Sequence, residues 1–329
     1  MEKAKTKLKL RAVTQKNSGK LAQLMRLKEG FTRSSDGTSI YYKSVGLGFP
    51  IVLCNGMGVS TFFWKYLENH FKHNFQVITW DYRGHGRSAP PEDKSKVNVL
   101  ALVEDCKAVC DELRIKKAVF IGHSLGTQVV LELYKKHPRY FAGIISAFGT
   151  FGRPMDFFYN SPISKYIFEV FTGISLLFPK QSNFISKLLI RNPFWYQLGG
   201  LMKMINTGMA SKADAQQYID HILSLEPEFF TKLSRSVQAH TAEDVLKKLK
   251  VPVLILGGEN DTFTPVWLAK KMHRVIPKSE LFIVKKGSHA ALVEQPELVN
   301  LRIEKFLRER VMPLCETPTL KPLPSAEAS

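Results

Sequence analysis

Residues 118–126 read AVFIGHSLG, the most informative stretch of this 329-residue chain. Its first half is a short apolar run, which is typical of a strand buried on both faces. Its second half places Ser124 between Gly122 and Gly126, and a helical pattern follows directly. This order of strand, serine and helix is the context of a nucleophile elbow. The turn strains the serine backbone and crowds its neighbours, so it needs both glycines.

Strands and helices alternate on both sides of this elbow. Asp36-Gly37 predicts a hairpin between residues 31–33 and 39–45. Strands are predicted over residues 51–54, 75–81, 118–122, 143–147, 251–257 and 281–284, and the first three of them are expected to be buried. Helices are predicted over residues 97–113, 126–137, 266–276 and 297–310. Apolar strands that alternate with helices predict a mostly parallel, doubly wound sheet, and the fold class is therefore α/β.

One long segment interrupts this alternation and defines the expected domains. Residues 149–240 show helical patterns without a strand, which predicts a helical cap or lid between two parts of an α/β core, residues 30–148 and 241–311. Such a cap would lie over the carboxyl ends of the strands, where open α/β sheets bind ligands. Residues 1–29 are expected to form a basic arm, and residues 312–329 a Pro-rich disordered tail.

The composition is that of a globular protein with an unusual charge. Apolar residues make up 44% and charged residues 23% of the chain, while 47 Lys and Arg against 29 Asp and Glu give a net charge of +18. No window of 18 apolar residues predicts a membrane-spanning helix. Basic surplus attracts anionic lipid or nucleic acid, but no nucleic-acid-reading motif is present and we expect no nucleic-acid partner. We expect a cytoplasmic protein.

A serine hydroxyl becomes a good nucleophile only when a base removes its proton. After a nucleophile elbow, the acid and then the histidine follow along the chain. Asp261 and His289 each come directly after a predicted strand, on the sheet edge where Ser124 is expected. We therefore predict a catalytic triad of Ser124, His289 and Asp261. Glu259 is the alternative acid, although it lies earlier in the same turn.

Ester cleavage also needs hydrogen-bond donors for the negative charge that develops on the carbonyl oxygen. One donor is the N–H of the residue after the nucleophile, Leu125, and the second comes from the loop after an early strand. That loop reads Asn55-Gly56-Met57-Gly58, so the Met57 N–H is our candidate. We predict no cofactor and no metal, because the sequence lacks H-E-x-x-H and lacks G-x-G-x-x-G after its first strand.

Residues 81–88, DYRGHGRS, resemble the D-x-R-G-x-G-x-S segment of the capped α/β-hydrolase branch, and the resemblance extends over residues 31–311. This resemblance implies a serine hydrolase similar to esterases and lipases. Epoxide hydrolases and dehalogenases carry Asp at the nucleophile position, whereas this chain has Ser124. Two positions depart from the family pattern: Asn55 replaces a frequent His, and Thr127 replaces a frequent Gly.

Large apolar side chains in the expected cap favour an apolar substrate. Phe151, Phe157, Phe158 and Trp195 are the candidate substrate contacts. We therefore expect a serine hydrolase of carboxylic esters with an apolar acyl group, an esterase or lipase for acylglycerol-like or lysophospholipid-like substrates. The alternatives are a C–C bond hydrolase, a perhydrolase or an acyltransferase on the same triad, and a ligand-binding protein with little turnover.

The membrane is a further candidate partner. The nearly continuous apolar segment 166–178 could rest on a membrane surface, with residues 1–29 adding attraction to anionic lipid. The alternative is a buried cap helix beside a solvated basic arm. Both interpretations stay open from the sequence.

Overall fold

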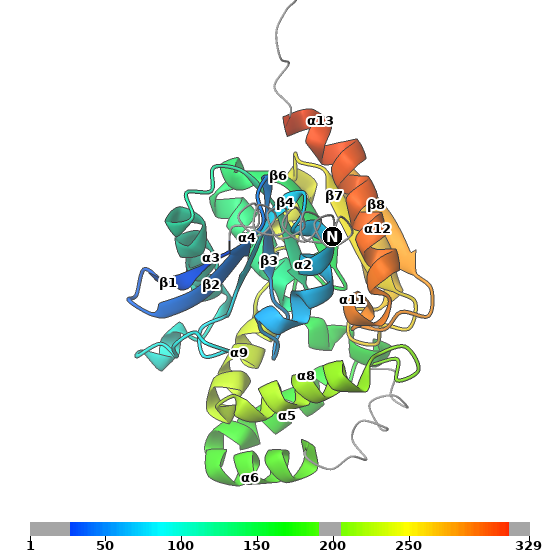
Figure 1. Cartoon of the computed structure of the whole chain (residues 1–329). Helices are drawn as coiled ribbons and strands as arrows, with labels where there is room; N and C mark the ends of the chain where they lie inside the picture. Colours follow the sequence, from blue (N-terminus) through cyan, green and yellow to red (C-terminus); the bar gives the residue numbers. More distant parts are fainter. Residues whose placement is uncertain (1–26, 191–204, 316–329) are drawn as a thin grey trace, which may run out of the picture.

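The computed structural model describes residues 27–190 and 205–315. Its centre is an eight-stranded sheet with the order β1-β2-β4-β3-β5-β6-β7-β8 (Figure 1). The strands are β1 (Lys28–Arg33), β2 (Ser39–Val45), β3 (Phe49–Cys54), β4 (Phe75–Trp80), β5 (Ala118–His123), β6 (Phe141–Ala147), β7 (Val253–Gly258) and β8 (Ser279–Val284). β2 runs antiparallel to its neighbours β1 and β4, and the six strands from β3 to β8 run parallel to one another. The predicted α/β class is confirmed.

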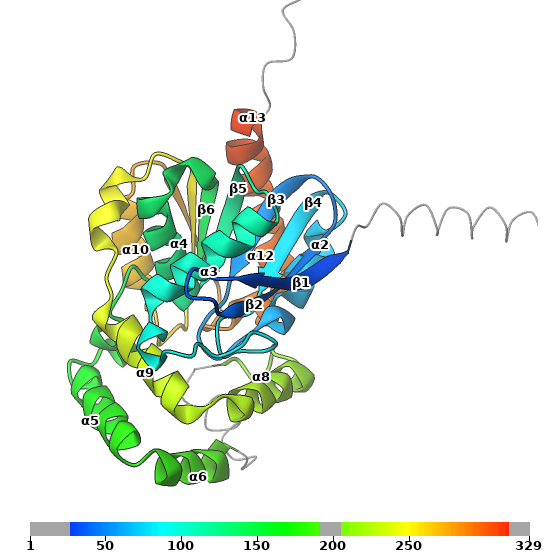
Figure 2. The same cartoon turned by 90° about the vertical axis from the view of Figure 1, so that its left-hand side faces the viewer.

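Helices cover both faces of the sheet. One face carries α3 (Val99–Glu112), α4 (Leu125–Lys136) and α10 (Val266–Val275), and the other carries α2 (Lys65–Phe71) and α12 (Pro296–Phe306) (Figures 1 and 2). β5 and β6 are buried at every residue, as expected for strands covered on both sides. Alternate residues of the strands enter two separate hydrophobic clusters, one on each face.

Between β6 and β7 the chain leaves the sheet for residues 148–252, which we call the helical insertion. It contains α5 (Ser164–Leu177), α6 (Pro179–Ile190), α8 (Lys212–Ser224), α9 (Pro227–Ala239) and several short 3₁₀ turns. In Figures 1 and 2 these four helices gather at one end of the molecule, with α5 and α6 farthest from the sheet. The insertion begins directly at the carboxyl end of β6 and is attached to the core through α9, which contacts α3.

The two chain ends differ slightly from the expected segments. β1 begins at Lys28, inside the expected basic arm, because the hairpin pairs Lys28 with Ser44. At the other end, α12 continues through a π-helical turn (Leu307–Val311) into α13 (Met312–Cys315), where the tail was expected. Met312 and Cys315 pack against the core, and this contact extends the helix. The rest of the arm and of the tail, and Trp195, lie outside the described residues. Across the described residues, no helix has the length and apolarity needed to span a bilayer.

Candidate active site

Ser124 lies on the strained turn that the sequence predicts. It joins the end of β5 to the start of α4 with φ 52° and ψ −117°, a backbone conformation that is rare for a residue with a side chain. The flanking glycines leave no room for a Cβ. A Cβ on Gly122 would lie 2.4 Å from the Gly126 backbone, and one on Gly126 would lie 2.1 Å from the Cys54 carbonyl oxygen. The two glycines therefore fix the turn that presents Ser124.

Three predicted residues meet at the carboxyl edge of the sheet. The Ser124 Oγ lies 2.9 Å from His289 Nε2, and His289 Nδ1 lies 2.9 Å from Asp261 Oδ2. Asp261 follows β7 and His289 follows β8, so neighbouring parallel strands bring them together. An Nδ1–H that donates to Asp261 leaves Nε2 free to accept the serine proton. This order of contacts has the geometry that a nucleophile, a base and an orienting acid require.

The Asp261 carboxylate is held from several directions. Its Oδ1 accepts the backbone N–H groups of Phe263 and Thr264 at 2.8 and 2.9 Å, and its Oδ2 also accepts the Thr264 hydroxyl at 2.7 Å. Asp261 is only 5% exposed. The alternative acid, Glu259, is exposed, and its carboxylate accepts the Lys286 backbone N–H at 2.8 Å. The geometry therefore selects Asp261 as the partner of His289.

His123 supports the loop that carries His289. Its ring lies between Phe63, at 4.7 Å, and the His289 ring, at 5.2 Å. Its Nε2–H donates to the His289 carbonyl oxygen at 3.1 Å. Burial lowers the pKa of His123 to about 3, so the ring is neutral at physiological pH. His123 thus has a structural hydrogen bond beside the site, whereas His289 is the histidine that contacts the Ser124 hydroxyl.

The loop after β3 packs against the elbow. A Cβ on Gly56 would lie 2.6 Å from the His123 ring and 3.3 Å from the Ser124 side chain, so the loop approaches the serine closely. Met57 follows at this point, and its sulfur accepts a hydrogen bond from Ser234 of α9 at 3.3 Å. Leu125 opens α4, and amides in a first helical turn have no acceptor within their own helix. Both predicted oxyanion donors therefore lie in segments next to Ser124.

Asn55, the first departure from the family pattern, holds the loop after β3 in place through three hydrogen bonds. Its side-chain amide donates to the Trp80 carbonyl oxygen at 2.7 Å, and its side-chain oxygen accepts the Trp64 indole N–H at 2.6 Å. Its carbonyl oxygen accepts the Tyr82 hydroxyl at 2.6 Å. Asn55 is fully buried, so these bonds tie the loop to β4 and to the turn before α2. The sequence did not reveal this support.

Thr127 is the second departure, and a nearby glycine accommodates it. The Thr127 hydroxyl donates to the Gly122 carbonyl oxygen at 3.0 Å, across the elbow. A Cβ on Gly149 would lie 2.0 Å from that hydroxyl oxygen. Gly149, just after β6, has no side chain, and this leaves space for the Thr127 side chain. A glycine at position 127 would not need that space.

The segment DYRGHGRS stabilises the loops beside the site. Arg83 is 1% exposed and makes a two-pronged ion pair with Asp105, at 2.8 and 2.6 Å, and a further ion pair with Asp36, at 2.7 Å. Asp81 accepts the backbone N–H groups of Thr61 and Arg87 at 2.8 and 2.9 Å. Burial raises the pKa of Asp81, and these two amides oppose that shift. The contacts of the motif's acid and arginine are structural.

Glu294 is a supporting residue that sequence reasoning missed. Its buried carboxylate accepts both the backbone N–H and the hydroxyl of Ser288, the residue before His289. It also accepts the Asn206 backbone N–H, in the helical insertion, at 2.7 Å. One carboxylate therefore links the histidine loop to the insertion. Ser288 lies six residues before Glu294, but Asn206 lies 88 residues away in the insertion, so the sequence does not indicate this link.

The predicted aromatic contacts lie at different distances from the site. The Phe158 ring packs on Phe263 at 4.8 Å, and Phe263 packs on the His289 ring at 4.9 Å. Phe151 is 3% exposed within the larger core cluster, and Phe157 packs against the same cluster. Of the described aromatic residues that we predicted, Phe158 is therefore the one connected to His289 through a single ring.

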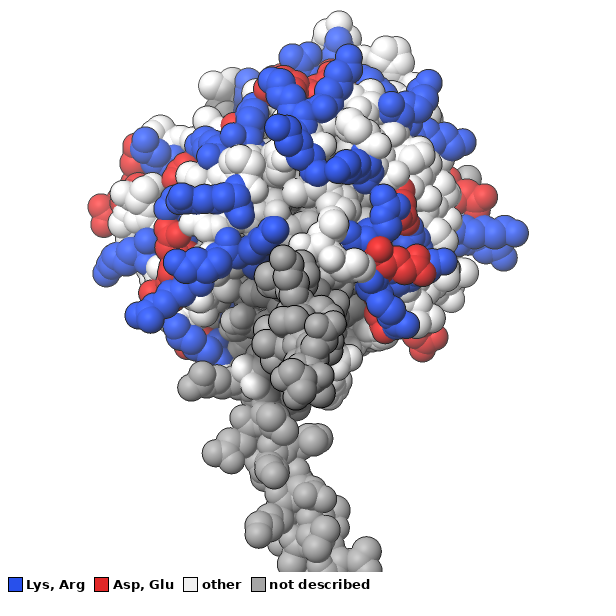
Figure 3. Space-filling view, turned by 90° about the horizontal axis from the view of Figure 1, so that it is seen from above, with Lys and Arg blue, Asp and Glu red and all other residues white. Residues whose placement is uncertain are grey.

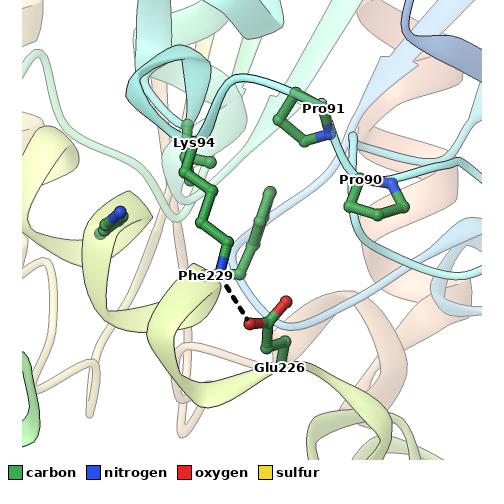
Figure 4. A pocket seen from close by; sticks show the side chains of 7 residues that line it. Pro90, Pro91, Lys94, Glu226 and Phe229 are labelled. Atoms are coloured by element: carbon green, nitrogen blue, oxygen red, sulfur yellow. Dashed lines mark hydrogen bonds and ion pairs between the residues drawn. The ribbon is translucent and has the colours of Figure 1, made fainter. Parts of the chain in front are cut away.

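A small pocket lies where the insertion meets the core. Figure 4 shows it between the loop at Pro90 and Pro91 and the start of α9. Lys94 bridges the two sides through ion pairs with Glu226, at 3.2 Å, and Glu228, at 2.6 Å. No triad residue lines this pocket. Within the described ranges, no group of three or more His, Cys, Asp or Glu residues is placed to hold a metal ion.

Comparisons with known proteins agree with this architecture. The chain is 25% identical over 280 residues to the AB hydrolase superfamily protein YisY of Bacillus subtilis, which covers 84% of this chain and 98% of that protein. Among solved structures, it resembles an esterase from Exiguobacterium antarcticum (TM-score 0.72, 19% identity, 85% of this chain and 100% of that one). It also resembles a thermophilic esterase from Thermogutta terrifontis (TM-score 0.70, 22% identity, 86% of this chain and 98% of that one).

At these identities the structural likenesses establish the fold alone. The family model provides the stronger link, because the model of the Alpha/beta hydrolase family matches residues 51–301. The matched range includes the elbow, the histidine loop and the strands that position them. The chain therefore belongs to the alpha/beta hydrolase family.

Proposed function

We propose that this protein is a serine hydrolase that cleaves carboxylic esters with an apolar acyl group. The observation that carries the proposal is the continuous hydrogen-bond chain from Ser124 Oγ through His289 to Asp261, with 2.9 Å at both steps. Chains of this kind activate a serine for attack on an acyl carbon. Two structural relatives are esterases by their titles, which favours ester substrates over other acyl compounds.

The proposed reaction proceeds in two halves. Ser124 Oγ attacks the ester carbonyl carbon while its proton passes to His289 Nε2, and Asp261 stabilises the resulting imidazolium. The N–H groups of Leu125 and Met57 would hold the oxyanion. His289 then gives its proton to the leaving alcohol, and an acyl-enzyme remains. A water that loses a proton to His289 attacks this intermediate, which releases the acid and restores Ser124.

The preference for an apolar acyl group rests on the surroundings of the histidine. Phe263 and Phe158 form an aromatic surface that begins at the His289 ring. The loop after β3 carries Met57, and Phe230 of α9 packs against this loop, within van der Waals range of a Cβ on Gly58. Apolar walls with few polar groups suit a hydrocarbon chain. In this proposal the helical insertion acts as the cap of the substrate site.

The test is labelling with a fluorophosphonate, which reacts with activated serines, beside p-nitrophenyl esters of increasing acyl length. We expect wild type to be labelled and to turn over esters, with a maximum at a medium or long acyl chain. Ser124→Ala should lose the label and about 10⁶-fold in kcat, because the nucleophile is gone. Ser95→Ala removes an exposed serine on a distant turn and should behave as wild type.

Two results would contradict the proposal in different ways. Full labelling or near-normal turnover in Ser124→Ala would remove the serine from the mechanism. Labelling of wild type without turnover of any ester would keep the activated serine and exclude ester hydrolysis. Carbon–carbon bond hydrolysis, perhydrolysis or acyl transfer on the same triad would then replace it.

A further inference from the structure

Helix α5 exposes most of its apolar side chains, whereas the two residues that it buries carry hydroxyl groups. Thr172 and Ser175 are 3% and 5% exposed. They face α9, where the Ser175 hydroxyl lies 3.1 Å from the Thr231 hydroxyl. On the outer side, Ile167, Phe171 and Leu177 are 65%, 64% and 74% exposed. This is the reverse of an ordinary surface helix, whose apolar stripe is buried against the core.

The exposed apolar residues form one continuous stripe. They recur at intervals of three and four along α5, so they share a single helical face. Helix α6 contacts α5 and adds further exposed apolar side chains. We call this set the α5–α6 face; its members are Ile163, Tyr166, Ile167, Val170, Phe171, Ile174, Leu177, Phe178, Phe184, Ile185 and Leu188. It lies at the end of the molecule farthest from the sheet (Figures 1 and 2).

A surface of this extent requires a partner. Single exposed apolar residues are normal, but contiguous apolar patches on a protein surface mark membrane or protein contacts. Aromatic and aliphatic side chains on in-plane amphipathic helices are the pattern of proteins that insert into the headgroup region of a bilayer. The α5–α6 face has this composition, with four aromatic residues among its members.

The charges around the face indicate which surface it meets. Lys165, Lys180 and Lys187 lie on the same two helices, and none makes an ion pair with a described residue. The acid of these helices, Glu169, is neutralised by an ion pair with Arg235 of α9, at 3.2 Å. Lys180 and Lys187 lie four residues before and three residues after Phe184, so they border the exposed residues of α6, whereas Lys165 lies on the other side of α5. The charge beside the face is therefore cationic, which complements anionic headgroups.

We propose that the α5–α6 face docks on an anionic phospholipid surface. The apolar stripe would enter the boundary between headgroups and acyl chains, while Lys180 and Lys187 meet the lipid phosphates. The inference goes beyond ester hydrolysis and does not depend on it. A second copy of this chain fits less well, because a twofold contact through this face would bring Lys180 and Lys187 of the two copies together.

A different part of the surface could also attract anionic lipid. Lys and Arg side chains gather on the face seen from above in Figure 3, at the opposite end of the molecule from α5 and α6 in Figure 1. Binding through that end would be electrostatic and would not involve the apolar stripe. The experiment therefore has to separate insertion of α5 from attraction to the basic end.

The test is co-sedimentation of the full chain with vesicles of phosphatidylcholine containing 30% phosphatidylglycerol, at 0.1 M and 0.5 M salt. The variant is Ile167→Gln, Phe171→Gln and Ile174→Gln together, at three exposed positions of α5. The matched control is Leu100→Gln, Leu298→Gln and Leu301→Gln, at exposed positions of α3 and α12. Gln keeps helix propensity, so both proteins should fold like wild type, which thermal unfolding checks.

We expect wild type and the control to bind the vesicles alike, and the α5 variant to bind on the order of 100-fold more weakly because three apolar side chains no longer leave water. Equal binding by the α5 variant, or binding that 0.5 M salt abolishes in wild type, would move the contact to the basic end and overturn the proposal. Absence of wild-type binding would also overturn it. So would a wild-type dimer, measured by light scattering, that the α5 variant lacks.

Hydrolysis of p-nitrophenyl butyrate, measured without vesicles, keeps this proposal separate from the proposed function. The α5 variant should hydrolyse this soluble ester at the wild-type rate, because its three substitutions lie on the exposed side of the insertion. Vesicle binding without ester hydrolysis would refute the proposed function and leave the docking surface in place. The opposite result would refute the docking surface alone.

Discussion

Replacing Asp261 by Asn tests whether the hydrogen-bond chain works through the tautomer of His289. The Asp261 Oδ1 accepts two backbone N–H groups, and Oδ2 accepts His289 Nδ1–H and the Thr264 hydroxyl. An asparagine has one oxygen to place. The backbone donors cannot rotate, whereas a hydroxyl can turn to accept, so the oxygen will stay on the backbone side and the NH₂ group will face His289.

This orientation reverses the tautomer of His289. A side-chain NH₂ at Nδ1 requires Nδ1 to accept, so the proton moves to Nε2, which faces Ser124 at 2.9 Å. An Nε2 that carries a proton cannot take the serine proton. In serine proteases the wrong tautomer lowers kcat about 10⁴-fold, and we expect the same order here, equal to about 5 kcal/mol of transition-state stabilisation.

The assay is kcat/KM for p-nitrophenyl butyrate at pH 7.5, combined with urea unfolding. Asp261→Asn should unfold within about 1 kcal/mol of wild type, because all four hydrogen-bond positions stay occupied. The matched control is Glu259→Gln, the exposed alternative acid two residues away, whose activity should stay within about twofold of wild type. A loss of less than tenfold in Asp261→Asn, or a larger loss in Glu259→Gln, would refute this assignment of the acid.

Three further predictions concern stability. Gly126→Ala should abolish soluble expression, because its Cβ would lie 2.1 Å from the Cys54 carbonyl oxygen, and soluble, active protein would contradict this. Arg83→Met should lower the free energy of unfolding in urea by about 3–5 kcal/mol, because it leaves Asp105 buried without its ion pair; a loss below 1 kcal/mol would show that the pair matters little. Burial lowers the pKa of His85 from 6.5 to about 4. Between these two pH values the His85 ring binds a proton in the unfolded chain but not in the folded protein. The free energy of unfolding is therefore unaffected by His85 above pH 6.5, and protonation of the unfolded chain lowers it by about 2 kcal/mol at pH 5. His85→Phe should lose less stability than wild type between pH 7.5 and pH 5 in urea unfolding, and an unchanged difference would exclude this cause.

The sheet was predictable because its strands are short apolar runs between clear turn signals. Each of the six strands predicted after the hairpin is present, with ends that differ by one or two residues, as for residues 251–257 against β7 at Val253–Gly258. The meeting of Ser124, Asp261 and His289 was predictable for a topological reason. Parallel strands end at one edge of the sheet, so residues that follow several strands lie together even when the chain separates them by 165 positions.

The supporting residues could not be predicted because their partners are chemically ordinary and lie in different loops and strands, at no fixed spacing. Asn55 bonds to Trp64 and Trp80, and Glu294 bonds to Ser288 and to a backbone amide of the insertion. A buried carboxylate or amide is stable wherever donors and acceptors converge. Sequence spacing contains no signal for such convergence. The convergence of donors and acceptors is visible only in the three-dimensional arrangement of the loops.

Helix α5 shows the same limit for a whole element. Its periodicity indicates an apolar face and a polar face, but periodicity does not say which one meets the protein. Small hydroxyl residues decide the orientation here: Ser175 reaches Thr231 of α9, and Arg235 of α9 lies 3.4 Å from the Thr172 hydroxyl. Rotating α5 to bury its apolar stripe would break these contacts and leave the Thr231 hydroxyl, in a residue only 6% exposed, without Ser175. The helix is therefore held with its apolar face outward by its own polar contacts, and the water that this face meets in the free protein is what a lipid surface would displace.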